Sequence, residues 1–349
     1  MAMTALQRLA AAATRHPADR IPIFCNLFDQ GPPELGMSPR DYYARGAHVA
    51  EGQLRLREKY GYDNIWSLFY VGREAELLGC HGIHFADEGP PNVEHFVVES
   101  LDDIARLTVP DDIAAHPAFE QPAECLRLLR EHVGGTYPIC AYVTATMTLP
   151  ALLMGMERWM SLLLMGPSGA RDALLAKCHE FFVKEVQAYR AGGADLILYS
   201  NPFGSTDTVP MKFFLSQALP WIDRDIRAAG TNGLVYYCGT SRINRVLDIV
   251  LDTTGTTAHY LSPFDSIADA KEIAGGRSLT CGVINDARMT DWTPDDVVAE
   301  VKRMTDAGMH GGRFLIGTGV MPVSIPEANI RAYMSAAREF GCHDYGGRR

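Results

Sequence analysis

A strand, helix, strand pattern near the end of the chain indicates the fold class: "SLTCGVI" (278–284), "WTPDDVVAEVKRMTDAG" (292–308) and "RFLIGTG" (313–319). The outer two runs are short and apolar without alternation, which is typical of strands buried on both faces of a parallel sheet. In the middle run, Thr293 suits an N-cap and Pro294 the first helical position. The stretch therefore predicts a βαβ unit.

The same unit recurs along the chain and predicts a single (β/α)8 TIM barrel of the α/β class. We expect one domain over residues 1–349, preceded by an N-terminal amphipathic helix and carrying an insertion, with a hairpin and a helix, at 82–112 between strands 2 and 3. A doubly wound open sheet is the alternative, but no GxGxxG or P-loop motif supports it. The eight predicted strands begin at Ile21, Asn64, Tyr137, Asp195, Leu234, Thr257, Ser278 and Arg313.

Composition excludes several functional classes. The chain has 349 residues and a net charge of −10, which argues against a nucleic-acid-binding surface. Its eight cysteines form no CxxC pair, which fits a reducing cytosol. Because no apolar run is long enough to span a bilayer, we expect a cytoplasmic protein with no membrane partner. We also expect one helix over 38–61, from the N-cap Ser38 to the stop at Gly61.

The active site of such a barrel lies at the carboxyl ends of its strands. The polar residues at these ends include carboxylates and amides, and none is a histidine. The candidates are Asp29, Tyr70, Glu74, Asn201, Tyr236, Cys238, Arg242, Asp265, Asn285, Asp286 and Thr318.

Each of these residues also has a structural interpretation. Asn201 and Asn285 suit turns and Asp286 suits an Asx turn that caps a helix. Glu74 could cap its helix or pair with a cation, and Arg242 could lie on a solvated helix face. Three interpretations are open for Cys238: a metal ligand, a nucleophile, or a small residue at a strand end.

Several motifs, in order and over about residues 20–339, resemble the uroporphyrinogen decarboxylase superfamily. They are "GREAELLGC", "PPNVEHFVVESLDDIARLTVPD", "AGGADLILYSNPFGS", "YYCG", "DSIADAKEIAGGR" and "IGTGVMPVSIPEANI". The resemblance implies a (β/α)8 barrel. It also implies one of two activities, tetrapyrrole decarboxylation or methyl transfer involving a corrinoid.

The decarboxylase branch fits poorly at its functional positions. Its arginine-rich N-terminal loop corresponds to "CNLFDQGPPE", which carries Asp29 and Glu34 and would repel an acidic porphyrinogen. Its acidic residue after the second strand corresponds to Tyr70, and its last-turn histidine to Thr318. The chain is therefore more similar to the corrinoid-dependent methyltransferases.

Members of that branch that methylate thiols hold zinc with a His-x-Cys pair and a second cysteine. The matching positions are Tyr236, Cys238, and Thr318 or Gly319, so only one ligand survives. A zinc site is disfavoured because zinc needs three or four protein ligands. An unusual site that joins Cys238 to Glu74 or Asp265 stays open.

A pterin acceptor needs hydrogen bonds rather than a metal, so tetrahydrofolate is the acceptor that we expect. The catalytic candidates are then Asn201, Asp286, Cys238 and Tyr236. The substrate-binding candidates are Asp29, Tyr70, Glu74, Asn285, Thr318 and Arg242.

The resemblance thus predicts an enzyme of one-carbon metabolism or demethylation that moves a methyl group between a methylated cobalamin and tetrahydrofolate. No corrinoid-carrying DxHxxG motif is present, so a partner corrinoid protein must supply the cobalamin. The alternatives are a decarboxylase or lyase of a non-porphyrin carboxylic acid, and a non-catalytic corrinoid- or metabolite-binding protein. The methyl donor compound, the direction of transfer and a homodimer stay open.

Overall fold

Seven parallel strands form the curled sheet at the centre of the protein. The structure is a computed structural model that describes residues 3–70, 72–85 and 91–342. Neighbouring strands follow the order β1-β4-β5-β6-β7-β8-β9, each parallel to the next. They are β1 (Ile65–Trp66), β4 (Ile139–Thr144), β5 (Leu196–Ser200), β6 (Leu234–Tyr237), β7 (Ala258–Tyr260), β8 (Leu279–Ile284) and β9 (Phe314–Thr318).

The predicted first strand closes the barrel without forming a regular ladder on both sides. Ile23 makes an isolated parallel bridge to Ile316 of β9, and Asn26 makes another to Val320, just after β9. On the other side, the Asn64 side chain replaces backbone groups: its Oδ1 accepts from Cys25 N at 2.9 Å and its Nδ2 donates to Cys25 O. The barrel prediction is thus confirmed with seven regular strands, and the predicted first strand contributes isolated bridges and side-chain bonds across the seam in place of an eighth regular strand.

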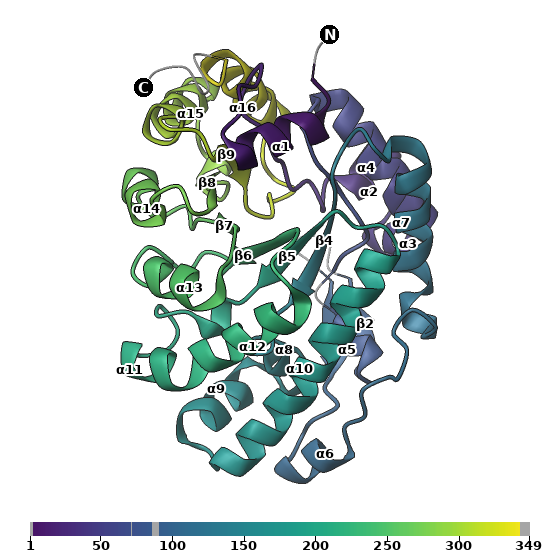
Figure 1. Cartoon of the computed structure of the whole chain (residues 1–349). Helices are drawn as coiled ribbons and strands as arrows, with labels where there is room; N and C mark the ends of the chain where they lie inside the picture. Colours follow the sequence, from purple (N-terminus) through teal and green to yellow (C-terminus); the bar gives the residue numbers. More distant parts are fainter. Residues whose placement is uncertain (1–2, 71, 86–90, 343–349) are drawn as a thin grey trace.

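Helices surround the strands on the outside, as Figure 1 shows. The longer ones are α4 (Gly46–Tyr60), α7 (Glu120–Val133), α9 (Met156–Met165), α10 (Ser168–Ala191), α12 (Leu219–Ala229), α13 (Leu247–Thr254), α14 (Ile267–Ala274), α15 (Pro294–Gly308) and α16 (Glu327–Phe340). The shorter ones are α2 (Gly31–Leu35), α3 (Pro39–Tyr43), α5 (Gly72–Leu77), α6 (Leu101–Arg106), α8 (Leu149–Met154) and α11 (Met211–Phe213).

The unit that predicted the fold forms as expected. Thr293 caps α15 in a capping box with Asp296, and Pro294 occupies the first turn. The prediction for 38–61 was wrong in one respect, because α3 and α4 are separate helices. Arg45 is extended between them, and Gly46 then packs so closely on Gln121 O that a Cβ would lie 2.2 Å from it.

The insertion between the second and third strands contains the predicted hairpin and helix. Its hairpin pairs β2 (His81–His84) with β3 (Asn92–His95) in antiparallel register, and α6 follows. Residues 86–90 of the insertion lie outside the described residues. In Figure 1, α6 and α9 lie at one end of the barrel and α1 (Ala5–Thr14) at the other.

The N-terminal helix α1 is anchored by a buried arginine. Thr4 and Gln7 form its capping box, and Arg8 donates to Asp63 Oδ1 at 2.7 Å and to both carboxylate oxygens of Asp19. The Asp63 carboxylate also binds Arg20. The predicted helix is therefore held to the start of the barrel by charge-assisted hydrogen bonds.

The methionine- and leucine-rich segment after β4 is only partly core. Trp159 of α9 is fully buried, whereas Met156 and Met165 are 64% and 82% exposed. Across the described ranges, no helix combines the length and the apolar character that crossing a membrane would require.

Candidate active site

Aromatic rings form a continuous layer inside the barrel, which we call the aromatic floor: Phe28, Phe69, Tyr142, Tyr237 and Tyr260. Successive ring centroids along this series lie 5.5, 4.0, 6.2 and 5.8 Å apart. Tyr142 is the half-buried member, and the other four are buried. A flat heterocycle can stack on such a floor.

The Tyr142 ring is fixed by its neighbour on the next strand. Its hydroxyl lies 2.6 Å from Ser200 Oγ, and the Phe69 ring packs on its face. The sequence analysis did not single out Tyr142 or Phe69, because both lie inside continuous apolar runs, where the sequence does not show which residues point into the barrel. The one available signal was that both are aromatic residues near the ends of neighbouring strands.

Asp286 supplies a carboxylate beside this floor, directly after β8. Its Oδ1 accepts from Ala287 N at 3.0 Å, and its buried Oδ2 has no hydrogen-bond partner among the residues that the structure describes. A Cβ on Gly319 would lie 2.7 Å from Oδ2, so the glycine makes room for the carboxylate. Burial raises the pKa of Asp286 to about 6, and its charge acts on the neighbouring Tyr237.

Asn285 and Thr318 have structural roles at their strand ends. The Asn285 Oδ1 accepts from Arg288 N at 3.2 Å, as in an Asx turn. The Thr318 hydroxyl accepts from Asn26 N at 3.0 Å, and its carbonyl accepts from the Asn26 amide. Thr318 therefore closes the barrel seam.

Tyr236, Cys238 and Asn201 form a cluster that lies on the helix side of the sheet. Tyr236 stacks on Tyr199, whose hydroxyl donates to Asp225 of α12 at 2.9 Å. Asn201 and Cys238 are the polar neighbours of the Tyr236 hydroxyl, and all three side chains are buried. Cys238 also lies close enough to the floor to act electrostatically on Tyr142 and Tyr237.

The Cys238 thiol is kept neutral by its surroundings. Burial raises its pKa to about 12, with a smaller opposing effect from the Tyr236 hydroxyl. A protonated thiol is a poor nucleophile and a poor metal ligand. The structure therefore favours the interpretation of Cys238 as a small residue at a strand end.

Glu74 is buried and faces a second acid instead of the cation that the sequence suggested. Its Oε1 accepts from Thr144 N at 2.6 Å, and the neighbouring group is the carboxyl group of Glu185 on α10. Neither Glu185 oxygen nor Glu74 Oε2 has a donor among the described residues, so two ionised carboxylates would repel each other and protonation of one of them is favoured. Desolvation raises the pKa of Glu74 to about 7 and that of Glu185 well above its usual range.

Tyr70 lies among rings and a cation near the start of α5. Its hydroxyl donates to Glu76 Oε2 at 2.9 Å, the Arg73 guanidinium lies 4.7 Å from its ring centroid, and the Tyr43 ring meets it edge-on. Its polar group is therefore already engaged.

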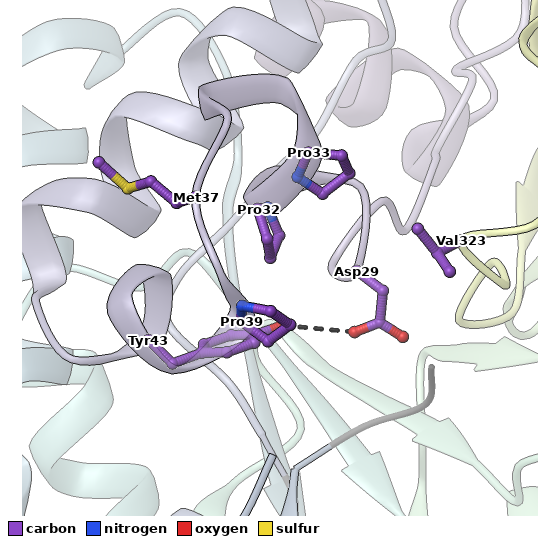
Figure 2. Close-up of a pocket in the computed structure, with 7 residues that line it drawn as sticks. All are labelled: Asp29, Pro32, Pro33, Met37, Pro39, Tyr43 and Val323. Atoms are coloured by element: carbon purple, nitrogen blue, oxygen red, sulfur yellow. Dashed lines mark hydrogen bonds between the residues drawn. The ribbon is translucent and has the colours of Figure 1, made fainter. Parts of the chain in front are cut away.

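Asp29 lines a separate small cavity of about 230 Å³. Figure 2 shows its carboxylate facing Tyr43, whose hydroxyl donates to Oδ1 at 3.4 Å, with Pro32 and Pro33 above and Val323 opposite. Burial raises the pKa of Asp29. The cavity combines one carboxylate with proline and aromatic walls, as expected for a minor binding site at the rim.

Arg242 and Asp265 lie on the loops after β6 and β7. Arg242 is exposed and paired with Asp207 at 3.3 Å, and both line an open hollow with Phe264. Asp265 accepts from the backbone N–H groups of Ile243, Asn244 and Ser262, so its oxygens hold the loop together.

The donor set does not fit zinc. Among residues 3–70, 72–85 and 91–342, no three His, Cys, Asp or Glu side chains gather as a metal site. Glu74 and Asp265 are committed to other partners, and Cys238 contacts Tyr236. The atypical zinc site left open by the sequence therefore has no support from the side-chain arrangement.

The fold is that of a (β/α)8 barrel, and the aromatic floor and Asp286 lie toward the carboxyl ends of its strands, the mouth of the barrel, where barrel enzymes have their active sites. Residues 4–340 match the family of uroporphyrinogen decarboxylase (URO-D). Since this match covers nearly the whole chain, the protein belongs to the URO-D family.

Characterised relatives and a solved structure align over almost the full length. The methylcobamide:CoM methyltransferase MtbA of Methanosarcina mazei is 26% identical over 97% of this chain and 98% of its own. The methylcobamide:CoM methyltransferase MtaA of Methanosarcina barkeri is 23% identical over 95% and 97%. The structure of a methyltransferase from Methanosarcina mazei has a TM-score of 0.83 at 20% identity, over 97% of this chain and 99% of that one, which shows a shared fold.

Proposed function

We propose that this protein is a corrinoid-dependent methyltransferase that moves a methyl group between a methylated cobalamin, held by a partner corrinoid protein, and tetrahydrofolate. The relatives named for methylcobamide substrates support the first half of this proposal. The same relatives are named for CoM, which is a thiol. The proposal therefore differs from their names in the acceptor of the methyl group.

The acceptor is inferred from the aromatic floor and Asp286 together. A thiol acceptor benefits from a metal that keeps it as a thiolate, and the described side chains offer no such site. A pterin presents a flat ring and several N–H donors. The half-buried Tyr142 can stack on the ring, and the unpaired Asp286 Oδ2 can accept from it.

Asp286 also suits the proton that this reaction releases. The bond between methyl carbon and cobalt breaks and its electron pair stays on cobalt, while the N5 lone pair of the pterin forms the new C–N bond. The proton on N5 must then leave, and the Asp286 carboxylate can take it because its pKa of about 6 leaves it ionised at neutral pH. The barrel itself orients the two reactants and excludes water.

Isotope transfer tests the proposal directly. Cobalamin carrying a CD₃ group, bound to a corrinoid protein, is incubated anaerobically with this protein and tetrahydrofolate, and the pterin is examined by mass spectrometry. The expected product is N5-CD₃-tetrahydrofolate, formed only with the protein present. A parallel incubation contains CoM as well. CD₃ found on CoM and absent from the pterin would show that the acceptor is a thiol and not tetrahydrofolate. No CD₃ on either compound would overturn the proposal of methyl transfer.

A further inference from the structure

A second cavity lies at the opposite end of the barrel from the mouth, between α1 and the amino-terminal ends of the strands. We call it the basal groove. It has a volume of about 420 Å³, within the usual range for small-molecule sites. Its wall from α1 consists of Leu6, Leu9, Ala10 and Ala13, and its wall from the barrel includes Phe24, Val235, Tyr260, Cys281, Leu315 and Arg313.

The α1 side of the basal groove leaves apolar surface in contact with water. The anchored face of α1 contains Ala5, Arg8 and Ala12, which are buried. The groove face is different: Leu6 and Leu9 are half-buried and Ala10 is exposed. Exposed apolar surface that lines a concavity commonly marks a binding site.

One cation stands at the groove wall without a balancing acid. Arg313 adopts a left-handed backbone with φ 50°. Its buried Nε has no partner in the described part of the chain, although Nη1 donates to Arg277 O at 3.0 Å. A left-handed conformation is unfavourable for a residue with a side chain, and such strain often accompanies function.

Two more cations surround Arg313. Arg15 packs beside Gly312, and Lys271 donates to the carbonyls of Gly312 and Arg313. Mutual repulsion with Arg15 and Arg313 adds to desolvation and lowers the pKa of Lys271 to about 8. Within the described ranges none of these three cations has an ion pair, whereas the groove carboxylate Asp195 is already paired with Arg130 at 3.1 Å.

We propose that the basal groove binds a small organic anion with an apolar, ring-sized body. The body lies between the groove face of α1 and the bottom of the barrel, and the anionic group lies at Arg313. This groove opens at the end of the barrel opposite the candidate active site, because most of its lining residues lie on α1 and at or before the starts of strands. Tyr260, which also belongs to the aromatic floor, lies between the two, and the proposal does not depend on methyl transfer.

The test uses two fluorescent probes that share one apolar body: 8-anilinonaphthalene-1-sulfonate, an anion, and N-phenyl-1-naphthylamine, which is neutral. Each is titrated into the full-length protein. We expect one molecule bound per chain, with the sulfonate bound more tightly. The Arg313→Gln substitution should weaken the affinity for the sulfonate about tenfold, which corresponds to the loss of one charged hydrogen bond. It should leave the affinity for the amine unchanged.

Two further variants keep the test decisive. Ala10→Trp fills the groove from an exposed helix position, which α1 should tolerate, and should abolish binding of both probes. Arg303→Gln removes an exposed cation of α15 that is away from the groove and should change neither. Unaltered binding in Ala10→Trp, or equal effects of Arg313→Gln and Arg303→Gln, would overturn the proposal. Thermal melting of each variant identifies any that fails to fold.

Discussion

At the residue scale, Asp286 carries the chemistry of the proposed reaction. Replacing it with Asn keeps the shape and removes the base. We expect turnover with tetrahydrofolate to fall by roughly 10²-fold, the lower range for a general base. The rise of kcat/KM with pH near about 6, the pKa of Asp286, should disappear. The exposed Asp291→Asn should keep both the rate and the pH profile, and a D286N enzyme with an unaltered profile would refute this role.

The same substitution should stabilise the protein. Because burial raises the Asp286 pKa to about 6, the folded state keeps a proton between about pH 4 and 6 that the unfolded chain releases. Stability therefore declines as pH rises through this window. In Asp286→Asn the decline should be absent and Tm at pH 7.5 should be higher, which differential scanning calorimetry at pH 4 and 7.5 measures. A lower Tm at pH 7.5 would contradict this account.

Cys238→Ala tests whether the thiol binds metal. Cys238 is buried against Tyr236, so its loss should cost about 1 kcal/mol of stability, a typical value for a point substitution, and leave zinc content and turnover unchanged. Zinc is measured by inductively coupled plasma mass spectrometry and stability by urea unfolding. Loss of zinc together with activity would instead make Cys238 a ligand.

Residue identity was easier to predict than residue direction. Asp286 was predicted from its place after a strand, but its free oxygen depends on Gly319, which comes from another strand end. Tyr236 and Tyr237 are adjacent, and only the second lies on the aromatic floor. A continuous apolar strand carries no alternation from which the sequence could show which tyrosine points inward.

At the element scale, two buried carboxyl groups, Glu74 of α5 and Glu185 of α10, are neighbours. Because burial raises the pKa of both, we expect the pair to keep one proton in the folded state to a higher pH than free carboxyl groups do, so stability should decline as pH rises from about 4.5 through about 7. Glu185→Gln can donate to Glu74 without this proton. It should weaken the decline and raise Tm at pH 8 by at least about 2 °C.

Circular dichroism melts at pH 5 and 8 measure this effect. Glu180→Gln is the matched control, because Glu180 is an exposed acid on the same helix, paired with Lys184. Identical pH dependence in Glu185→Gln and the native protein would show that the two carboxyl groups do not share a proton.

Another element-scale prediction concerns how α1 is held to the barrel. Arg8→Ala removes the bonds to Asp19 and Asp63, although Arg20 still faces Asp63. We expect a loss of about 2 kcal/mol, below the 3–5 typical of a fully broken buried pair. Arg55→Ala, which breaks an exposed pair, should cost about 0.5 kcal/mol or less. Guanidinium unfolding compares them, and equal losses would show that Arg8 does not anchor α1.

Element boundaries followed the sequence where local signals were strong. The capping box and proline of α15 placed its start correctly. The break between α3 and α4 was missed because its cause is not local: Gly46 approaches the backbone of Gln121 on another helix. The barrel seam was likewise hidden, because the side chains of Asp63 and Asn64 make hydrogen bonds there that backbone groups make in a regular ladder.

At the scale of the whole molecule, the URO-D fold provides the frame and the mouth decides which reaction it supports. The family and the barrel follow from motifs spread over the full chain. The identity of the methyl acceptor does not follow from these motifs, because it depends on which side chains meet at the ends of different strands. Here these are an aromatic floor and one unpaired carboxylate, and they are the basis for proposing a pterin in place of a thiol.

The visible absorption spectrum of methylcob(III)alamin distinguishes a pterin acceptor from a thiol acceptor. The metal-stripped protein is mixed anaerobically with corrinoid-protein-bound methylcobalamin and either tetrahydrofolate or CoM. We predict conversion to cob(I)alamin with tetrahydrofolate, at a rate unaffected by chelator, and no conversion with CoM. If the corrinoid is converted with CoM and not with tetrahydrofolate, and only after zinc is added back to the stripped protein, the pterin proposal is contradicted.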